Sequence, residues 1–562
     1  MSSYHIHKPV EDYTLKNIDI LSLIFDSEIS LTTDDTVMHI EAACPHNKVT
    51  KPKCREYTER IAYVLREAYG IGAKRPGTDV VTCISTGHVL LPSLFYGVMA
   101  AGGVYSAASP SFTVAELAKQ LQHGESGLVI ASDDCKEVAS QAALQCGLPR
   151  SRVLVLKSDG GERSLHACCP GSPNLLEQYL GRLEWERVFD PAVLREQTCA
   201  LFYSSGTTGD PKGVRFSQQK LTSSAQVSLY TFRDYLTRQE ARLPDFKLEY
   251  RTIAHLPVAH IAGCQGYLLH PALCAGTVYW MPRFQFPDFL SYCKTYRITF
   301  FFTVPPIYQL LVNSPLVTDQ FQHMIHTLSG AALMDAELAQ QVEAKLHCTV
   351  SQTWGMSETT GSVTLSPWDT SVTDGSLAPL LSNMRLRLVD DNGVDVAEGQ
   401  VGEFLVQGPM VTPGYWKDES ATREAFTADG NGRAWLRMGD LGYVRDGKFF
   451  IADRKKEVIK YKGLQVAPTE VEALLRTHSL VKDAAVVGVP DPNISRNELP
   501  RAYIVAGYRG VTAAEIEEFV KINLASFKHL RGGVVFIDAI PKSLSGKILR
   551  RLLKEGLGTA HI

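Results

Sequence analysis

A stretch rich in serine, glycine and threonine contains the residues of this sequence that are best suited to bind phosphate. Residues 201–217, LFYSSGTTGDPKGVRFS, begin with apolar residues typical of a strand and continue into a polar loop. Its candidate phosphate ligands are the hydroxyls of Ser204, Ser205, Thr207 and Thr208, the backbone at Gly206 and Gly209, and the amine of Lys212. The spacing differs from the Walker loop, so a kinase-like or GTPase-like site is not predicted. The same composition is also typical of a flexible turn, so the loop alone does not establish its chemistry.

Length and charge restrict the class of protein that carries this loop. A chain of 562 residues with 45% hydrophobic content is too long for one core, so two or more domains are expected. The formal net charge of -3 provides no general attraction to nucleic acid or anionic membranes, and phosphate binding must therefore be local. The 12 cysteines are scattered without C-x-x-C pairs, which favours a reduced intracellular compartment.

Residues 89–108 form the longest apolar run. They contain Pro92, Gly102 and Gly103 and lie between segments that resemble strands of a soluble protein, so a buried helix and turn is predicted in place of a membrane span. The N-terminal residues are polar and lack the apolar region of a secretory signal.

The elements around the loop alternate between helical and strand patterns. Such alternation predicts an α/β fold with a mostly parallel sheet covered by helices. Residues 158–174 are polar and contain glycine, and we expect a surface loop there. Strands are predicted at 80–84, 127–131 and 152–157, and helices near 59–67 and at 89–100 and 114–122.

Further motifs follow the loop in a fixed order. These are LPVAH at 256–260, SQTWGMSETTG at 351–361, WLRMGDLGYV at 435–444, DRKKEVIKYKG at 453–463 and PKSLSGK at 541–547. Together with the loop they resemble the signatures of the adenylate-forming enzymes, which include acyl-CoA synthetases, 4-coumarate-CoA ligases, beetle luciferases and the adenylation domains of peptide synthetases. The resemblance covers residues 50–553.

The resemblance implies a two-domain organisation. The family has a large N-terminal domain of stacked α/β subdomains with a small β-rich subdomain, and a smaller mobile α+β C-terminal domain that carries a catalytic lysine. The corresponding segments here are an N-terminal domain at 1–452 with its β-rich part at 384–452, a hinge at 453–456 and a C-terminal domain at 457–562.

The resemblance also implies roles for individual residues. Lys547 matches the catalytic lysine, Glu358 the magnesium ligand, and Lys456 the hinge residue, while His260 and Lys460 match further positions close to the reaction. The implied ATP site adds Gly330, Ala331, Trp354, Gly355, Ser357, Asp440 and Arg454 to the loop, with Trp354 along adenine and Asp440 on the ribose hydroxyls. The implied acyl pocket comprises Ala259, His260, Gly263, Ala332, Thr360, Ser362 and Val363, and the CoA side comprises Lys460, Gly463 and Leu464.

Two positions depart from the family pattern. Ala259 replaces a residue that is usually bulky or aromatic in the phenylpropanoid ligases, which implies either extra room beside the carboxyl end of the substrate or room that is filled from elsewhere. Met438 replaces a usual threonine next to Asp440, which puts that neighbouring nucleotide contact in doubt.

The predicted activity is a two-step ligation of a carboxylic acid to a thiol. ATP, with Mg²⁺ as cofactor, would activate the acid as an acyl-adenylate with release of pyrophosphate, and coenzyme A would then accept the acyl group. The alternatives are loading of a phosphopantetheine carrier protein in trans and a luciferase-type oxygenase. Nucleic acid and a membrane span are not expected as partners. The C-terminal residues Ala560, His561 and Ile562 resemble a degenerate peroxisomal tripeptide that an import receptor would bind, and a cytoplasmic location is the other prediction.

Overall fold

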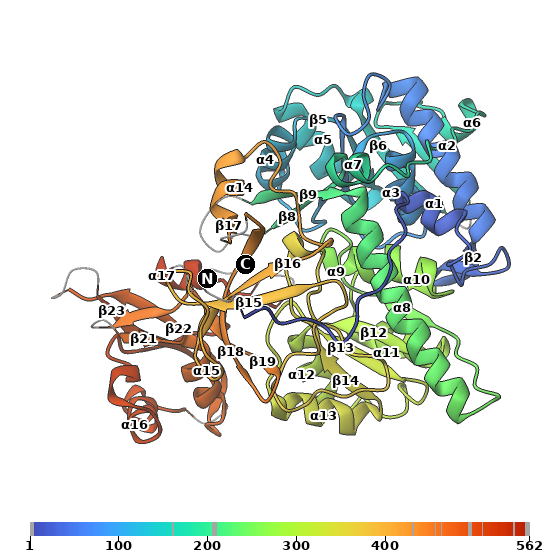
Figure 1. Ribbon diagram of the computed structural model, residues 1–562. Helices are drawn as coiled ribbons and strands as arrows, with labels where there is room; N and C mark the ends of the chain where they lie inside the picture. Colours follow the sequence, from blue (N-terminus) through green and yellow to red (C-terminus); the bar gives the residue numbers. More distant parts are fainter. Residues whose placement is uncertain are drawn as a thin grey trace.

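The structure, a computed structural model, describes residues 5–159, 162–204, 211–429, 432–455, 457–461, 464–492, 497–507, 510–542 and 546–556. Two α/β lobes, coloured blue to yellow in Figure 1, form the larger part of the molecule. A β-rich part lies beside them, and the C-terminal part, in orange and red, packs at its edge. This mixed α/β architecture confirms the predicted fold class.

The first lobe is built on a seven-stranded sheet in the order β7-β6-β5-β3-β4-β8-β9. The five inner strands are parallel, and β7 and β9 pair antiparallel at the two edges. The strands are β3 (Val80–Ile84), β4 (Val104–Ala108), β5 (Ser126–Ser132), β6 (Val153–Asp159), β7 (Glu162–Ala167), β8 (Thr198–Ser204) and β9 (Lys212–Ser217). The accompanying helices are α1 (Ile20–Phe25), α2 (Lys51–Tyr69), α3 (Leu91–Ala100), α4 (Val114–Gly124), α5 (Lys136–Gln145), α6 (Leu175–Gln178), α7 (Pro191–Glu196) and α8 (Gln218–Arg242).

Strand β7 corrects one sequence prediction. Residues 158–174 were expected to form a surface loop, but β7 pairs antiparallel with β6 in a register that runs from Leu154 opposite Ala167 to Asp159 opposite Glu162. The prediction was wrong because an edge strand in a hairpin obtains its hydrogen bonds from its neighbour and needs little apolar content.

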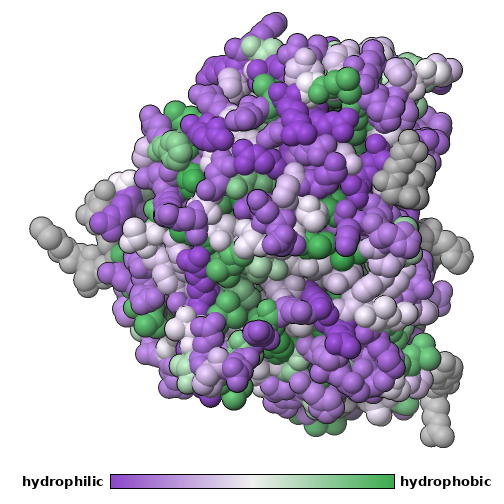
Figure 2. All heavy atoms as spheres, turned by 90° about the vertical axis from the view of Figure 1, so that its right-hand side faces the viewer, coloured by the Kyte–Doolittle hydropathy of each residue, from purple (hydrophilic) through white to green (hydrophobic). Residues whose placement is uncertain are grey.

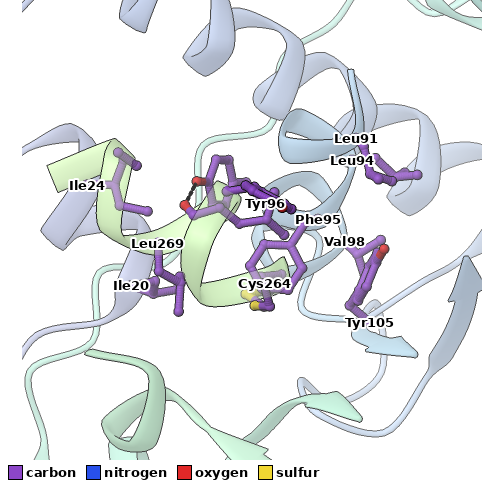
Figure 3. Close-up of a cluster of buried hydrophobic side chains, with 14 of the residues drawn as sticks. Ile20, Ile24, Leu91, Leu94, Phe95, Tyr96, Val98, Tyr105, Cys264 and Leu269 are labelled. Atoms are coloured by element: carbon purple, nitrogen blue, oxygen red, sulfur yellow. Dashed lines mark hydrogen bonds between the residues drawn. The ribbon is translucent and has the colours of Figure 1, made fainter. Parts of the chain in front are cut away.

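The apolar run at 89–108 is part of the core, as predicted. All ten residues of α3 are buried, and the chain then continues into buried strand β4. Figure 3 shows Phe95 and Tyr96 of α3 packed against Ile20 and Ile24 of α1 and against Cys264 and Leu269. The Tyr96 hydroxyl donates a hydrogen bond to the Leu268 carbonyl. In the described part of the chain, no helix combines the length and the apolar character that crossing a membrane requires.

The second lobe carries a four-stranded sheet, β10-β11-β1-β2, next to the three-stranded parallel sheet β12-β13-β14. Thr299 joins the two sheets, since its backbone N–H donates to the Arg251 carbonyl. The strands are β1 (Val37–Glu41), β2 (Cys44–Thr50), β10 (Arg251–Ala254), β11 (Thr277–Trp280), β12 (Phe300–Thr303), β13 (His326–Ser329) and β14 (Thr349–Gln352). The helices are α9 (Ile261–Gly263), a π-helical turn at Cys264–Leu269, α10 (His270–Leu273), α11 (Phe286–Thr295), α12 (Pro305–Asn313) and α13 (Ala336–Leu346).

The β-rich part and the C-terminal part follow in sequence. The β-rich part contains β15 (Arg385–Val389), β16 (Gly402–Gln407), α14 (Glu419–Ala425), β17 (Phe426–Ala428), β18 (Ala434–Arg445) and β19 (Lys448–Arg454). The C-terminal part contains β20 (Ile459–Tyr461), β21 (Leu464–Val466), α15 (Pro468–Arg476), β22 (Val481–Pro490), β23 (Glu498–Ala506), α16 (Ala513–Asn523), β24 (Val534–Phe536) and α17 (Arg550–Lys554). Short 3-10 turns lie at Asp133–Cys135, Arg150–Arg152, Ser357–Thr359 and Ser526–Lys528. Figure 2 shows one face of the assembled molecule, on which hydrophilic residues cover most of the surface.

Candidate active site

A cavity of about 1110 Å³ lies where the two lobes, the β-rich part and the C-terminal part meet. Residues from every motif that the sequence singled out reach this cavity, although they are spread over more than 340 positions of the chain, from Ser204 to Lys547. The predicted site residues that line it are Ser204, Lys212, Ala259, His260, Gly263, Ala331, Gly355, Ser357, Glu358, Ser362, Asp440, Arg454 and Lys547.

Other predicted site residues lie elsewhere. Among the described residues, Gly330, Ala332, Trp354, Thr360, Val363, Lys460 and Leu464 are not part of the cavity lining. Lys460 and Leu464 belong to the hairpin of β20 and β21, where the Lys460 backbone N–H donates to Glu498 and the Leu464 side chain is exposed. Ser205, Gly206, Thr207, Thr208, Gly209, Lys456 and Gly463 lie outside the described residues.

Asp440 holds a carboxylate at the wall of the cavity. It lies in β18, is 8% exposed, and accepts a 2.8 Å hydrogen bond from the indole Nε1 of Trp354. Arg454 at the end of β19 places its Nε 3.3 Å from the other carboxylate oxygen, because the register of the two strands sets Asp440 opposite Arg454. Burial raises the pKa of Asp440, and Arg454 opposes this shift.

Trp354 does not line the cavity but lies behind it, in contact with Asp440. Its ring centroid lies 4.8 Å from that of Phe404, and its side chain is 8% exposed. The indole therefore orients the Asp440 carboxylate from behind, a contact that sequence reasoning missed because the two residues are 86 positions apart.

Lys547 brings a cation of the C-terminal part to the same cavity. Burial and the charge of Arg454 lower the pKa of its amine to about 8, and Glu457 and Asp440 oppose this shift. The Lys542–Ile548 bridge closes the segment that carries Lys547, and Lys542 itself pairs with Asp483 of β22 at 2.6 Å. The lysine is thus held on the C-terminal part while its side chain faces the lobes.

Glu358 lies in the short turn Ser357–Thr359 and is 3% exposed. The Tyr415 hydroxyl donates a 2.7 Å hydrogen bond to its carboxylate. Lys220 of α8, which is fully buried, donates a 2.8 Å hydrogen bond to the carbonyl of Ser357. Burial lowers the pKa of Lys220 well below its usual range, and the charge of nearby Glu358 opposes that shift.

Sequence reasoning assigned no role to Lys220 or Tyr415. Lys220 is on the face of α8 that also carries buried Ser224 and Val227. The helical spacing of these residues was the sequence signal that could have indicated a buried Lys220. Tyr415 is 57 positions from Glu358 in the sequence, and only their contact in the folded chain shows its role.

Ser204 and Lys212 frame the described part of the phosphate loop. Strands β8 and β9 place them directly opposite each other in an antiparallel pair. The Lys212 amine lies 5.2 Å from the centroid of the Tyr415 ring, which connects the loop to the residue that holds Glu358.

His260 marks the beginning of the acyl side. It is the N-cap of α9, where its Nδ1 accepts a hydrogen bond from the Ala262 backbone N–H, so the proton of the neutral ring is on Nε2. The imidazole itself is exposed to the cavity, and desolvation by the surrounding protein lowers its pKa to about 4, which favours the neutral ring near pH 7. Gly263 is required here, because a Cβ at this position would lie 2.4 Å from the Pro257 carbonyl oxygen.

The cavity therefore combines the cations Lys212, Arg454 and Lys547 with the buried carboxylates of Asp440 and Glu358. Lys212 belongs to the predicted phosphate-binding stretch and is the first residue of β9. No group of three or more histidine, cysteine, aspartate or glutamate side chains able to hold a metal occurs in the described ranges. A cation bound at Glu358 would thus need further oxygen ligands, which nucleoside phosphates supply.

Comparisons with known proteins agree with this geometry. Residues 32–416 match the AMP-binding enzyme family, and residues 470–547 match the AMP-binding enzyme C-terminal domain. An Emericella nidulans protein named as an acyl-coenzyme A synthetase is 51% identical over 552 residues, which are 97% of each chain. Phenylacetyl-CoA ligase epaB of Aspergillus niger is 33% identical over 547 residues, 96% of each chain.

Solved structures share the fold. ATP-bound MatB from Rhodopseudomonas palustris superposes with a TM-score of 0.80 at 24% identity and covers 96% of this chain and 99% of its own. The family matches and the shared fold define an enzyme of the nucleotide-binding class. The chain belongs to the AMP-binding enzymes, the adenylate-forming superfamily.

Proposed function

We propose that this chain is an ATP-dependent acyl-CoA ligase of the AMP-forming type. It activates a carboxylic acid as its acyl-adenylate, releases pyrophosphate and transfers the acyl group to coenzyme A. The observation that carries this proposal is the meeting of Lys547, Asp440 and Glu358 at one cavity, in a chain whose relatives are acyl-CoA synthetases and ligases.

The first step needs positive groups around the α-phosphate. As the carboxylate attacks, negative charge grows on the phosphate oxygens, and the Lys547 ammonium and the Lys212 amine are the cations of the site that offset it. Asp440, held by Trp354 and Arg454, accepts hydrogen bonds from the ribose hydroxyls. His260 has its Nε2 proton available as a donor to the acyl carboxylate.

Glu358 would hold Mg²⁺ in this proposal. Its carboxylate faces the cavity, and one carboxylate together with phosphate oxygens is a normal Mg²⁺ site. The metal would neutralise phosphate charge when ATP is bound. Tyr415 and Lys220 keep Glu358 in place from the protein side.

Transfer of the acyl group to CoA requires that the C-terminal domain present a different face to the cavity. Lys547 lies at the reacting end of the cavity, so a thiol can reach the acyl-adenylate only after this lysine moves away. We place the hinge at 453–456, between an N-terminal domain at 1–452 and a C-terminal domain at 457–562. Rotation there would bring Lys460, Gly463 and Leu464 to the CoA side.

The acid is proposed to be an aryl or medium-chain acid. Ala259, Ala262 and Gly263 occupy little room beside His260, and the cavity continues beyond them to aromatic side chains. A related protein of Aspergillus niger is a phenylacetyl-CoA ligase by name, which supports an acid of this kind.

The test is acid-dependent product formation. The chain would be incubated with ATP, Mg²⁺ and a panel of aliphatic, aryl and hydroxy acids, with and without CoA, and the products identified by mass spectrometry. Acyl-CoA for a subset of acids is expected. Acyl-adenylate that accumulates and ignores CoA would overturn CoA as the acceptor and favour a carrier protein.

A peroxisomal location is proposed from the C-terminal tripeptide Ala560, His561 and Ile562, which lies outside the described residues. A fluorescent protein fused to the last ten or so residues would then enter peroxisomes. A uniform cytoplasmic signal would contradict the proposal.

A further inference from the structure

The acyl side of the cavity ends on an aromatic cluster. Of the rings around Trp368, the three nearest are Phe232 at 4.9 Å, Tyr250 at 5.0 Å and Phe300 at 4.7 Å between centroids. All four side chains line the cavity, so this cluster forms its deep end. These rings favour the binding of substrate acids with apolar or aryl acyl groups.

The path from His260 to this cluster is open. Ala259, Ala262, Gly263 and Gly266 line it with small side chains or none. A Cβ added at Gly266 would meet no heavy atom within 4 Å, so the π-helical turn leaves free space along this wall.

Two polar atoms at the deep end lack a partner. Nε2 of His270 and Oγ of Ser366 are buried and make no hydrogen bond with any described residue, and both residues line the cavity. A buried donor or acceptor without a partner is costly, and native proteins rarely leave one unless something else binds there. The third such atom on the lining, Oε1 of Gln120, belongs to α4 of the first lobe.

Both residues are connected to the aromatic cluster through residues close to them in the sequence. Ser366 lies two positions before Trp368, whose ring packs on Tyr250. The Tyr250 ring and Pro271, which directly follows His270, both lie within 3 Å of the point where a Cβ would stand on Gly276. His270 and Ser366 are therefore each within two positions of a residue that packs near the Tyr250 ring, and both line the cavity.

The charged side chains next to the aromatic cluster, the Arg238–Asp369 ion pair and Arg233, are not part of the cavity lining. Burial lowers the pKa of His270 to about 4, so its imidazole carries no charge at neutral pH. The lysines and arginines that line the cavity are at its nucleotide end or on the β-rich and C-terminal parts: Lys212, Arg437, Arg454, Lys542 and Lys547. A second carboxylate of a substrate would thus be buried here without a counter-charge, which is strongly unfavourable.

We propose that the acid carries an uncharged oxygen group, a hydroxyl, keto or ether oxygen, remote from its carboxylate, and that His270 and Ser366 bind this group at the aromatic end of the channel. This inference rests on the proposed acyl-CoA ligase function and specifies its substrate class. The channel thus discriminates against the plain acid of the same length, because that acid leaves both polar atoms unpaired.

The experiment compares matched pairs of acids. Each pair has one chain length and differs only in a hydroxyl or keto oxygen, which is moved along the chain from one pair to the next, and kcat/KM for acyl-CoA formation is measured for both members. For at least one position the oxygenated acid should exceed the plain acid by roughly tenfold or more. The dicarboxylic acid of the same length should be the poorest substrate.

Variants test the assignment to His270. In His270→Leu the oxygenated-to-plain ratio should fall to near one, and Ser366→Ala should lower it in part. His39→Leu is the matched control, because His39 also has a buried Nε2 without a partner among the described residues but does not line the cavity. This control should keep the wild-type ratio.

The outcomes separate the two proposals. A wild-type ratio near one at every position, or an unchanged ratio in His270→Leu, would overturn the polar subsite while leaving the ligase function intact. If His270→Leu does not fold, the oxygenated-to-plain ratios of the wild type and of Ser366→Ala still test the polar subsite. No acyl-adenylate or acyl-CoA from any acid would instead overturn the proposed function.

Discussion

The amine of Lys220 lies 2.8 Å from the carbonyl oxygen of Ser357, although the two residues are 137 positions apart. This contact fixes the turn that presents Glu358, and the Lys220 side chain also lies 3.7 Å above the Phe216 ring. A buried lysine is costly, so its place below the proposed metal ligand indicates that it positions this turn.

Replacing Lys220 by methionine should loosen that turn. The Ser357 carbonyl would lose its donor, and we expect the free energy of unfolding to fall by about 2 kcal/mol. The Mg²⁺ concentration for half-maximal adenylation should also rise. Urea unfolding and a Mg²⁺ titration of the rate measure the two effects. The exposed Lys482→Met serves as the control, and an unchanged Mg²⁺ requirement in Lys220→Met would argue against the positioning role.

Lys547 should act only in the first half-reaction and only as a cation. Lys547→Ala is expected to slow adenylation by roughly a hundredfold or more and to spare thioester formation from supplied acyl-adenylate. Because burial lowers the pKa of this lysine to about 8, kcat/KM for adenylation should decline as the pH rises above 8 and the charge is lost. Lys547→Arg should remove that decline. Equal loss of both half-reactions in Lys547→Ala would contradict the assignment.

Asp440 should determine the preference for a complete ribose. Asp440→Asn keeps an acceptor for Trp354 but loses the charge-assisted bonds to ribose, each worth about 2 kcal/mol. We expect KM for ATP to rise by roughly tenfold or more and the discrimination against 2′-deoxy-ATP to shrink. Steady-state kinetics with both nucleotides measure this. The prediction fails if the variant keeps the full wild-type discrimination.

Lys456→Pro should impair transfer to CoA and spare adenylation, the opposite of the effect expected for Lys547→Ala. Lys456 lies outside the described residues, and the family resemblance makes it the hinge residue. Proline fixes φ, so adenylation should persist while transfer to CoA is impaired. Rapid-quench measurement of each step would show this, and normal CoA transfer would exclude the hinge role of Lys456.

Acid should destabilise the protein partly through His255. Its Nδ1 donates to the Ile253 carbonyl and its Nε2 accepts from the Thr303 hydroxyl at 2.8 Å, and burial lowers its pKa to about 4. The unfolded chain takes up this proton near pH 6.5, so the stabilisation is complete above that pH and is lost as the pH falls toward 4.

His255→Asn tests this relationship. Between pH 7 and pH 5 the wild-type free energy of unfolding should decrease by about 2 kcal/mol more than that of the variant. Urea unfolding at both pH values measures the difference. Parallel decreases in the two proteins would show that His255 is not the group responsible.

The sequence alone was sufficient for the α/β class, and through the family resemblance it led to the proposal of the reacting groups. Strands such as Val80–Ile84 and helices such as Leu91–Ala100 have local apolar patterns that predict them directly. Asp440, Glu358 and Lys547 lie in short motifs whose residues are neighbours along the chain, so their types and spacing were visible without coordinates.

The tertiary structure decided how those groups are held and where the channel leads. The contacts between Lys220 and Ser357 and between Trp354 and Asp440 join segments 137 and 86 positions apart, and no local pattern encodes such a pair. The aromatic cluster next to the proposed polar subsite likewise forms only because side chains from four separate segments pack together. Local propensity and motif spacing are properties of the chain, whereas burial and the absence of a partner are properties of its packing.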